Sequence, residues 1–233
     1  MSRNRERDEA IKTRCKLSAM ESAFRLFSEK GIETVKMTDI VEDCGVSRQS
    51  LYRYFSTKTD LVIAVGAWQW REYINRYSAQ LPSERDEKLT AAERMKLYMD
   101  SFINLYRSHK DILRFNYYFN SFLANERASP EQNRPYTEVV DHLKRAFHEL
   151  YLKGMKDGTL RTDLPESVMF SSSFHIMLAA ATRYAMGLVY LEDGVDPERE
   201  LILLEEALLG TYVVEQNRHH TDLSTAMEDR TDE

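Results

Sequence analysis

Apolar side chains recur every three or four positions along most of the chain, and this spacing is typical of helices that bury one face. In the first such stretch Leu17, Met20, Phe24 and Phe27 form one apolar stripe. No stretch alternates apolar and polar residues as a strand would, so the predicted fold class is all-α. The same pattern, with its caps and breaks, predicts nine helices, near residues 9–30, 38–44, 48–55, 58–80, 90–108, 110–125, 135–157, 165–191 and 198–216.

Two short predicted helices are joined by a tight turn. Thr38 suits the start of the first, because its hydroxyl can accept a hydrogen bond from a free backbone N–H group. The negative charge of Asp39 suits the positive end of the helix dipole. Gly45 suits the left-handed conformation that ends a helix, and Ser47 can cap the next one. Two helices around a glycine turn, the second with a basic and polar face, form a helix-turn-helix, which is a DNA-binding motif.

The distribution of charge fits a DNA-binding head on an acidic body. Residues 1–58 hold 12 Lys and Arg against 9 Asp and Glu, a net charge of +3, whereas residues 59–233 hold 20 against 29, a net charge of −9. From residue 47 to residue 58 there are three cations and no acid. The alternative is that charge merely fluctuates between segments. For attraction to DNA phosphates the local excess of positive charge matters more than the net charge of the whole chain, because salt screens charges beyond roughly 8–10 Å.

Several classes of function lack their signatures. The two cysteines, Cys15 and Cys44, have no C-x-x-C spacing and fit a reducing cytoplasm. No nucleophile elbow, phosphate loop, nucleotide fingerprint or metal-spaced His/Glu pair occurs, and His219-His220 is an isolated pair in a polar tail. We therefore expect no enzyme activity, no cofactor and no metal. With no apolar run near 18 residues and no signal-peptide core, we also expect no membrane contact.

The second helix of the motif carries the candidate base contacts. A recognition helix presents its N-terminal residues to base edges in the major groove. Arg48 can pair with guanine and Gln49 with adenine, and Ser50 stands beside them. Arg53, about one turn further on, can reach a base or a phosphate. For each of these side chains the alternative is an ordinary solvated helix surface.

At these residues the sequence resembles a known family. The run TDIVEDCGVS followed by SLYRYFSTKTDL resembles the DNA-binding domain of the TetR family of bacterial transcriptional regulators, and AFRLFSEKG resembles its first helix. The resemblance covers about residues 17–65, and beyond residue 80 it extends only to a general layout of helices. It implies a three-helix DNA-binding head at residues 1–58 and a six-helix ligand-binding and dimerisation body at 59–217. Residues 218–233 read as a disordered tail.

The resemblance also implies contacts and partners. Tyr52 and Tyr54 fall on the family's aromatic phosphate-contact positions, where Tyr54 replaces a more usual His, and a phenol can still donate to phosphate. Thr38, Ser47 and Lys58 complete the phosphate contacts, and Lys58 stands at a helix start that suits an anion. The implied partners are a double-stranded DNA operator and a second copy of the chain, joined through the last two helices.

A cavity for a small-molecule inducer is the last implied feature. Such sites are mostly apolar, with a few polar groups. Three polar side chains are candidate anchors: Arg114, His142 and His175. The candidate lining is aromatic, although ordinary core packing is the alternative for each residue: Trp68, Tyr73, Phe102, Tyr106, Phe115, Tyr118, Phe119 and Phe122. The acidic body favours a cationic ligand, but a solvated acidic surface explains it equally well.

The function that follows is a cytoplasmic, homodimeric transcriptional regulator, a repressor that a small-molecule ligand releases from a palindromic operator. A second hypothesis keeps the DNA-binding head but makes the chain an architectural or cell-division partner protein without an inducer. A closed, collapsed body would favour this second hypothesis, and a cavity that holds unexplained density would oppose it.

Overall fold

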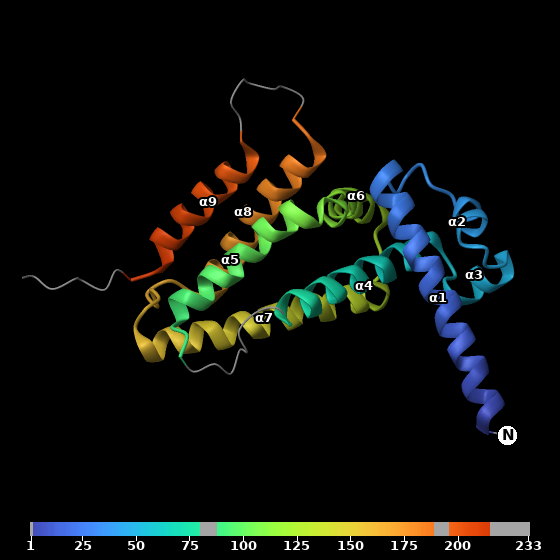
Figure 1. The fold of residues 1–233 in the computed structure, drawn as a ribbon, viewed down its shortest axis with the longest axis horizontal. Helices are drawn as coiled ribbons and strands as arrows, with labels where there is room; N and C mark the ends of the chain where they lie inside the picture. Colours follow the sequence, from blue (N-terminus) through green and yellow to red (C-terminus); the bar gives the residue numbers. More distant parts are fainter. Residues whose placement is uncertain (1, 80–87, 189–195, 215–233) are drawn as a thin grey trace, which may run out of the picture.

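The computed structural model describes residues 2–79, 88–188 and 196–214, and within them the chain forms nine helices (Figure 1). The predicted all-α class, three helices in a head and six in a body, is confirmed. The helices are α1 (Ser2–Lys30), α2 (Met37–Cys44), α3 (Arg48–Tyr54), α4 (Lys58–Ser78), α5 (Ala91–Ser108), α6 (Lys110–Glu126), α7 (Pro130–Asp157), α8 (Glu166–Met186) and α9 (Pro197–Tyr212).

The first helix begins earlier than the apolar pattern predicts. It starts at Ser2 rather than near residue 9. The added segment has no Gly or Pro, and its three Arg and one Glu favour helix even without a buried face. Three helices end before their predicted ends at residues 80, 191 and 216: α4 at Ser78, α8 at Met186 and α9 at Tyr212. The predicted tail, residues 218–233, lies outside the described residues.

The seventh helix also begins before its predicted start at Pro135. Ser129 caps it by accepting a hydrogen bond from the Gln132 N–H at 3.2 Å, and Pro130 occupies the first turn. Pro135 then lies inside the helix, where it lacks an N–H to donate. The cap and the first proline therefore decide where α7 begins, and the predicted loop at residues 128–134 is mostly its first turn.

The caps of the short helices follow the sequence closely, with one correction. Gly45 has a φ of 67° and ends α2, and the Ser47 hydroxyl accepts from the Ser50 N–H at 3.2 Å to begin α3. Thr38 does not cap α2 as predicted. The helix starts one residue earlier, and the Asp39 carboxylate accepts from the Lys36 N–H at 2.8 Å. Thr38 thus lies inside the first turn of α2, and the Asp39 carboxylate in that turn suits the positive end of the helix dipole.

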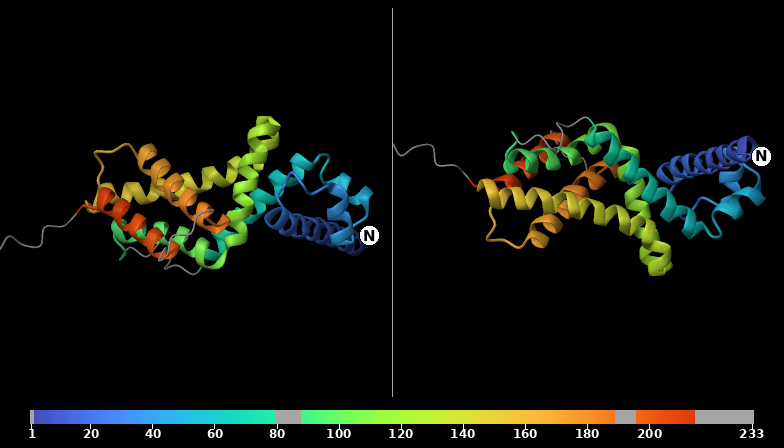
Figure 2. Two further views of the ribbon diagram at one scale, coloured as in Figure 1. Left: turned by 90° about the horizontal axis from the view of Figure 1, so that it is seen from above. Right: turned by 90° about the horizontal axis from the view of Figure 1, so that it is seen from below.

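The head and the body lie at opposite ends of an elongated molecule (Figure 2). α4 begins at the head and runs into the body beside α7, and α6 crosses between α1 of the head and α8 of the body. One apolar core runs through both parts and includes Phe27, Leu51, Phe115 and Met99. None of the helices in the described ranges has the length and apolar character needed to cross a membrane.

Candidate DNA-binding surface and ligand cavity

The α3 helix is fixed on one face and free on the other. Leu51 is fully buried and Phe55, the residue after the helix, is 3% exposed, so both anchor α3 to the core of the head. Arg48, Gln49 and Arg53 are exposed, and Ser50 is half-buried beside the cap. The sequence-predicted base contacts therefore share one accessible face of α3 that carries no acidic side chain.

The two tyrosines of α3 support the arginines. The Arg48 guanidinium lies over the Tyr52 ring at 5.6 Å, and the Arg53 guanidinium lies over the Tyr54 ring at 5.3 Å, both within the range of cation–π contacts. Tyr52 is 40% exposed, whereas Tyr54 is half-buried against the core. The aromatic residues thus hold two flexible cations close to the helix, which lowers the entropy that they lose on binding.

The remaining candidate phosphate contacts differ in accessibility. Thr38 and Ser47 are exposed near the start of their helices. The Lys58 ammonium instead turns toward the protein, where it donates to the Glu33 carbonyl at 3.4 Å and lies 5.6 Å from the Phe122 ring centre. Burial lowers the pKa of Lys58. To meet a phosphate, Lys58 has to leave these contacts.

A polar cluster that the sequence analysis missed fixes α2 against α1. The Asp43 carboxylate accepts a hydrogen bond from the Ser22 hydroxyl at 2.5 Å and forms an ion pair with Arg25. The Ser22 hydrogen bond, followed by that of Arg25, holds the pKa of Asp43 below its ordinary value. Ser22 and Arg25 lie on α1 at helical spacing, but nothing in the sequence pairs them with an acid 18 to 21 residues away. This cluster orients the motif that presents α3.

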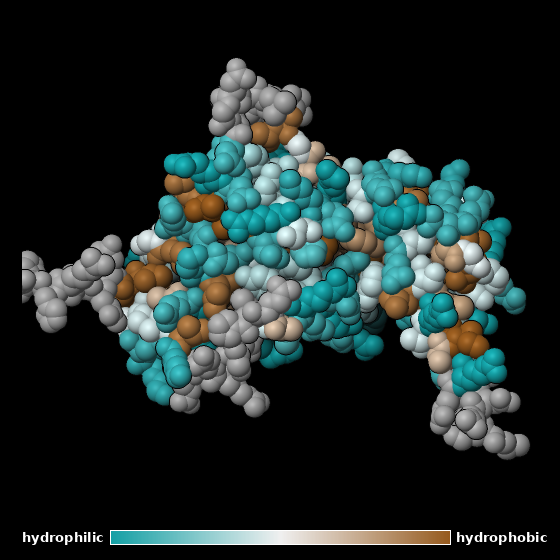
Figure 3. Space-filling view, viewed as in Figure 1, coloured by the Kyte–Doolittle hydropathy of each residue, from teal (hydrophilic) through white to brown (hydrophobic). Residues whose placement is uncertain are grey.

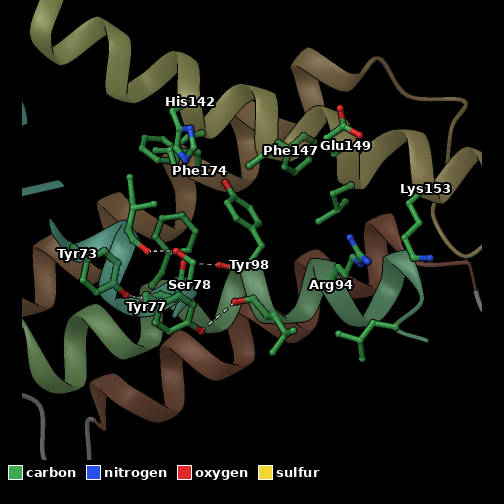
Figure 4. Close-up of a pocket in the computed structure, with 18 of the residues that line it drawn as sticks. Tyr73, Tyr77, Ser78, Arg94, Tyr98, His142, Phe147, Glu149, Lys153 and Phe174 are labelled. Carbon is green, nitrogen blue, oxygen red and sulfur yellow. Dashed lines mark hydrogen bonds between the residues drawn. The ribbon is translucent and has the colours of Figure 1, made fainter. Parts of the chain in front are cut away.

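A cavity of about 610 Å³ lies in the body between α4, α5, α7 and α8 (Figure 4). Of the candidate pocket residues, Tyr73, Phe102 and His142 line it. Trp70, Tyr77, Tyr98, Phe147 and Phe174 also line it and were missed. The size is typical of a cavity for a small molecule, for which roughly 300–1,000 Å³ is usual. The family resemblance implied such a cavity, but the sequence did not show which aromatic residues face it.

Four other candidate pocket residues lie at the junction between the head and the body. Phe115 contacts Phe24 of α1 with ring centres 5.6 Å apart, and Phe119 follows it on the same face of α6. Tyr118 packs against Gly31, and Phe122 lies beneath Lys58. These rings fill the space between α1, α4 and α6, so none of them lines the cavity.

The last four candidates also lie away from the cavity. Trp68 is half-buried against the core of the body. Tyr106 packs edge-on against Tyr184, and the Arg114 guanidinium donates to the Ala185 carbonyl at 3.0 Å. His175 is exposed on the outer face of α8. Arg114 and His175 are therefore not anchors of this cavity.

Two of the tyrosine hydroxyls at the aromatic end of the cavity already donate hydrogen bonds within the protein. The Tyr73 hydroxyl donates to the Ser101 carbonyl at 2.5 Å, and the Tyr77 hydroxyl donates to the Leu97 carbonyl at 3.2 Å. Burial raises the pKa of Tyr73, and it raises the pKa of Tyr77 to about 12, so both remain donors at neutral pH. These bonds tie α4 to α5. The Trp70 indole N–H is buried and has no hydrogen-bond partner among the described residues.

The described residues show no metal centre. Across residues 2–79, 88–188 and 196–214, no three His, Cys, Asp or Glu side chains come together as a set of metal ligands would.

Comparison with known proteins agrees with the geometry of the head. Residues 19–65 match the family model for "Bacterial regulatory proteins, tetR family". An HTH-type transcriptional regulator of Staphylococcus aureus is 29% identical over 191 residues, which cover 80% of this chain and 97% of that protein. The chain is thus a DNA-binding transcriptional regulator of the helix-turn-helix class. Its residues 19–65 form a DNA-binding head of the tetR type.

Solved structures share the whole fold. A putative transcriptional regulator from Saccharomonospora viridis in complex with choline has a TM-score of 0.67 at 17% identity, covering 87% of this chain and 99% of that one. The regulator FadR of Bacillus subtilis in complex with stearoyl-CoA has a TM-score of 0.63 at 18% identity, covering 83% and 97%. At such low identity these likenesses concern the fold alone.

Proposed function

We propose that the protein is a homodimeric repressor that binds a palindromic operator through α3 and releases it when a small molecule occupies the cavity of the body. The accessible basic face of α3, on a head that matches the family model, is the observation that carries this proposal. A bacterial cytoplasm is the compartment in which such a regulator meets its DNA.

The roles within the DNA-binding surface follow from accessibility and chemistry. Arg48 and Gln49 would read base edges in the major groove, because bidentate Arg–guanine and Gln–adenine pairs fit there. Ser50 and Arg53 would complete the base contacts. Phosphates would meet Thr38, Ser47, Tyr52, Tyr54 and Lys58, which fix position rather than sequence. The Arg48–Tyr52 contact would then place a base-reading and a phosphate-binding group side by side.

A single α3 buries too little surface for operator-level affinity, so a second copy is needed. The outer faces of α8 and α9 offer the surface for it. Ile176 and Leu203 are 41% and 52% exposed, and Val168 is 50% exposed. Figure 3 shows hydrophobic residues interrupting the polar surface over this part of the body. A four-helix interface through these faces would set the separation of the two heads.

The cavity favours a ligand-responsive protein over the architectural alternative. A body that serves only as a spacer has no need for about 610 Å³ of space lined by aromatic residues. Two proteins of the same fold hold choline and stearoyl-CoA in their solved structures. Because Tyr73 and Tyr77 tie the cavity wall of α4 to α5, a ligand there would bias the position of α4 and thereby of the head.

The test is selection of bound sequences from random duplex DNA, followed by mobility-shift titration. We expect a palindromic site to be enriched. Arg48→Ala should weaken binding to that site by about 1–3 kcal/mol and relax the preference at one position of each half-site. Arg145→Ala, an exposed arginine on α7 far from the head, is the matched control and should leave binding unchanged. Enrichment of no sequence, or an unchanged base preference in Arg48→Ala, would refute the assignment.

A further inference from the structure

The cavity in the body is aromatic at one end and cationic at the other. Tyr73 and Phe102 belong to the aromatic end, and Arg94 of α5 with Lys153 and Lys156 of α7 belong to the other. Figure 4 shows Arg94 and Lys153 at the end of the cavity opposite Tyr73 and Tyr77. The cations come from two helices that lie beside each other, α5 and α7. The space thus has a long apolar part and one charged mouth.

The local charge is opposite to that of the body as a whole. Three cations and one carboxylate, that of Glu149, line the cavity, whereas residues 59–233 carry a net charge of −9. The surface acids are solvated and act over roughly 8–10 Å, so the lining decides what the cavity accepts. The cationic ligand that the acidic composition favours would meet Arg94 and Lys153 at the mouth and be repelled.

The rings at the aromatic end do not decide the charge of the ligand. Aromatic rings alone can attract a cation. The three cationic side chains at the other end, Arg94, Lys153 and Lys156, favour a negatively charged group instead.

We propose that the cavity binds an amphiphilic anion, with its apolar part among Trp70, Tyr98, Phe147 and Phe174 and its carboxylate or phosphate head between Arg94 and Lys153. This inference rests on the proposed function, in which the cavity is the ligand site, and it names the chemical class of the ligand. An arginine and a lysine on facing helices can pair with either anionic group, and guanidinium favours bidentate pairing.

Three probes with the same ten-carbon chain separate the effect of the head from that of the tail. Decanoate, decanol and decyltrimethylammonium are titrated into the full-length protein, with heat and tryptophan fluorescence as readouts, since Trp70 lines the cavity. We expect decanoate to bind more tightly than the ammonium probe by about tenfold or more, because hydrogen bonds to charged groups are strong ones. Decanoyl-CoA and CoA alone then distinguish a carboxylate head from a phosphate-bearing one.

Charge-removing variants test the mouth of the cavity directly. Arg94→Gln and Lys153→Gln should each weaken binding of the anionic probe about tenfold and leave decanol binding unchanged. Arg145→Gln, an exposed cation on α7 that does not line the cavity, is the matched control. If circular dichroism shows that Arg94→Gln does not fold, the Lys153→Gln variant at a half-buried position provides the test. Equal or tighter binding of the ammonium probe, no binding of any probe, or unchanged anion affinity in both variants would overturn the proposal.

Operator binding is measured separately, so that the two proposals can fail separately. If decanoate or decanoyl-CoA binds but does not release the operator, ligand-driven release is refuted while the ligand class is supported. If the ammonium probe binds best and releases the operator, the ligand class is refuted while ligand-driven release is supported.

Discussion

At the scale of a single residue, two opposing effects act on the charge of the buried Glu205 carboxylate: a lysine partner favours it and burial disfavours it. Its side chain, on α9, is only 4% exposed and accepts a hydrogen bond from Lys96 of α5 at 3.1 Å. Lys96 also pairs with Asp100 at 2.9 Å, and the Tyr77 hydroxyl of α4 is nearby. Burial raises the pKa of Glu205 despite the lysine, and the charge of Asp100 adds to this. The ionised form of Glu205 is therefore less favourable in the folded chain than in the unfolded one.

We predict that Glu205→Gln stabilises the protein at neutral pH. The folded state binds the Glu205 proton more tightly than the unfolded state, so the penalty is full above the folded pKa and vanishes as pH falls below the ordinary value of 4.5. Lys96 keeps Asp100 as its partner in the variant. Urea unfolding at pH 7 and pH 4.5 measures the difference. A variant that is less stable at pH 7 would mean that the Lys96 pair outweighs the desolvation of Glu205.

Local chemistry at this scale is largely predictable from the sequence. Gly45 was predicted to end a helix and Ser47 to cap one, and each does so through atoms within a few residues. The predicted capping role of Thr38 was wrong. Thr38 and Asp39 are adjacent and both carry side-chain oxygens, and it is Asp39 that accepts the hydrogen bond at the start of α2. The Ser22–Asp43 bond was out of reach, because it joins residues 21 positions apart.

Between helices, α4 and α6 come into close contact where the head meets the body. Gly66 of α4 faces the ring of Phe119, and a Cβ atom at Gly66 would lie 2.7 Å from it. Phe119 is 1% exposed and packs on Tyr136 with ring centres 4.7 Å apart, so it has little room to move. Nearby, the Thr59 hydroxyl donates to Glu126 at 2.7 Å. The absence of a side chain at Gly66 allows the two helices to approach closely.

We predict that Gly66→Ala destabilises the protein by about 1–3 kcal/mol, the usual cost of overpacking a core, although alanine favours helix. Urea unfolding gives the value, and Asn75→Ala, an exposed position on α4, is the control. Adding Phe119→Leu to Gly66→Ala should recover part of the loss, because it removes the ring that the new methyl group meets. Additive effects in this double-mutant cycle would contradict the close approach.

The spacing of apolar residues predicts where the helices are, but it does not predict which helices pack against each other. Phe115 and Phe119 of α6 stand four residues apart, as Phe170 and Phe174 of α8 do, and their chemistry is the same. Of these four rings only Phe174 lines the cavity. Only the crossing of α6 between α1 and α8 sends the first pair to the junction with the head. For the same reason composition pointed to a cationic ligand, whereas the assembled cavity gathers Arg94 and Lys153.

At the scale of the whole molecule, the proposed dimer would set the spacing of its two heads through the outer faces of α8 and α9. On α9, Leu203, Ala207 and Gly210 follow one another at helical spacing and are exposed, so they form an apolar stripe with small residues at its centre. Ile176 on α8 extends this stripe. Small residues allow helices of two copies to pack closely, and large apolar residues at the edge provide the buried area.

We predict that Leu203→Asp and Ile176→Asp each convert the dimer to monomer, because a carboxylate cannot be buried without a partner in such an interface. The dimer dissociation constant should rise by more than about thirtyfold, as for a central interface residue. Light scattering coupled to size exclusion measures it, with Met155→Asp, a 60% exposed apolar residue on α7, as the control. Operator affinity should fall in parallel, because linked heads bind the second half-site at a high effective concentration. Variants that stay dimeric while Met155→Asp dissociates would move the interface to α7.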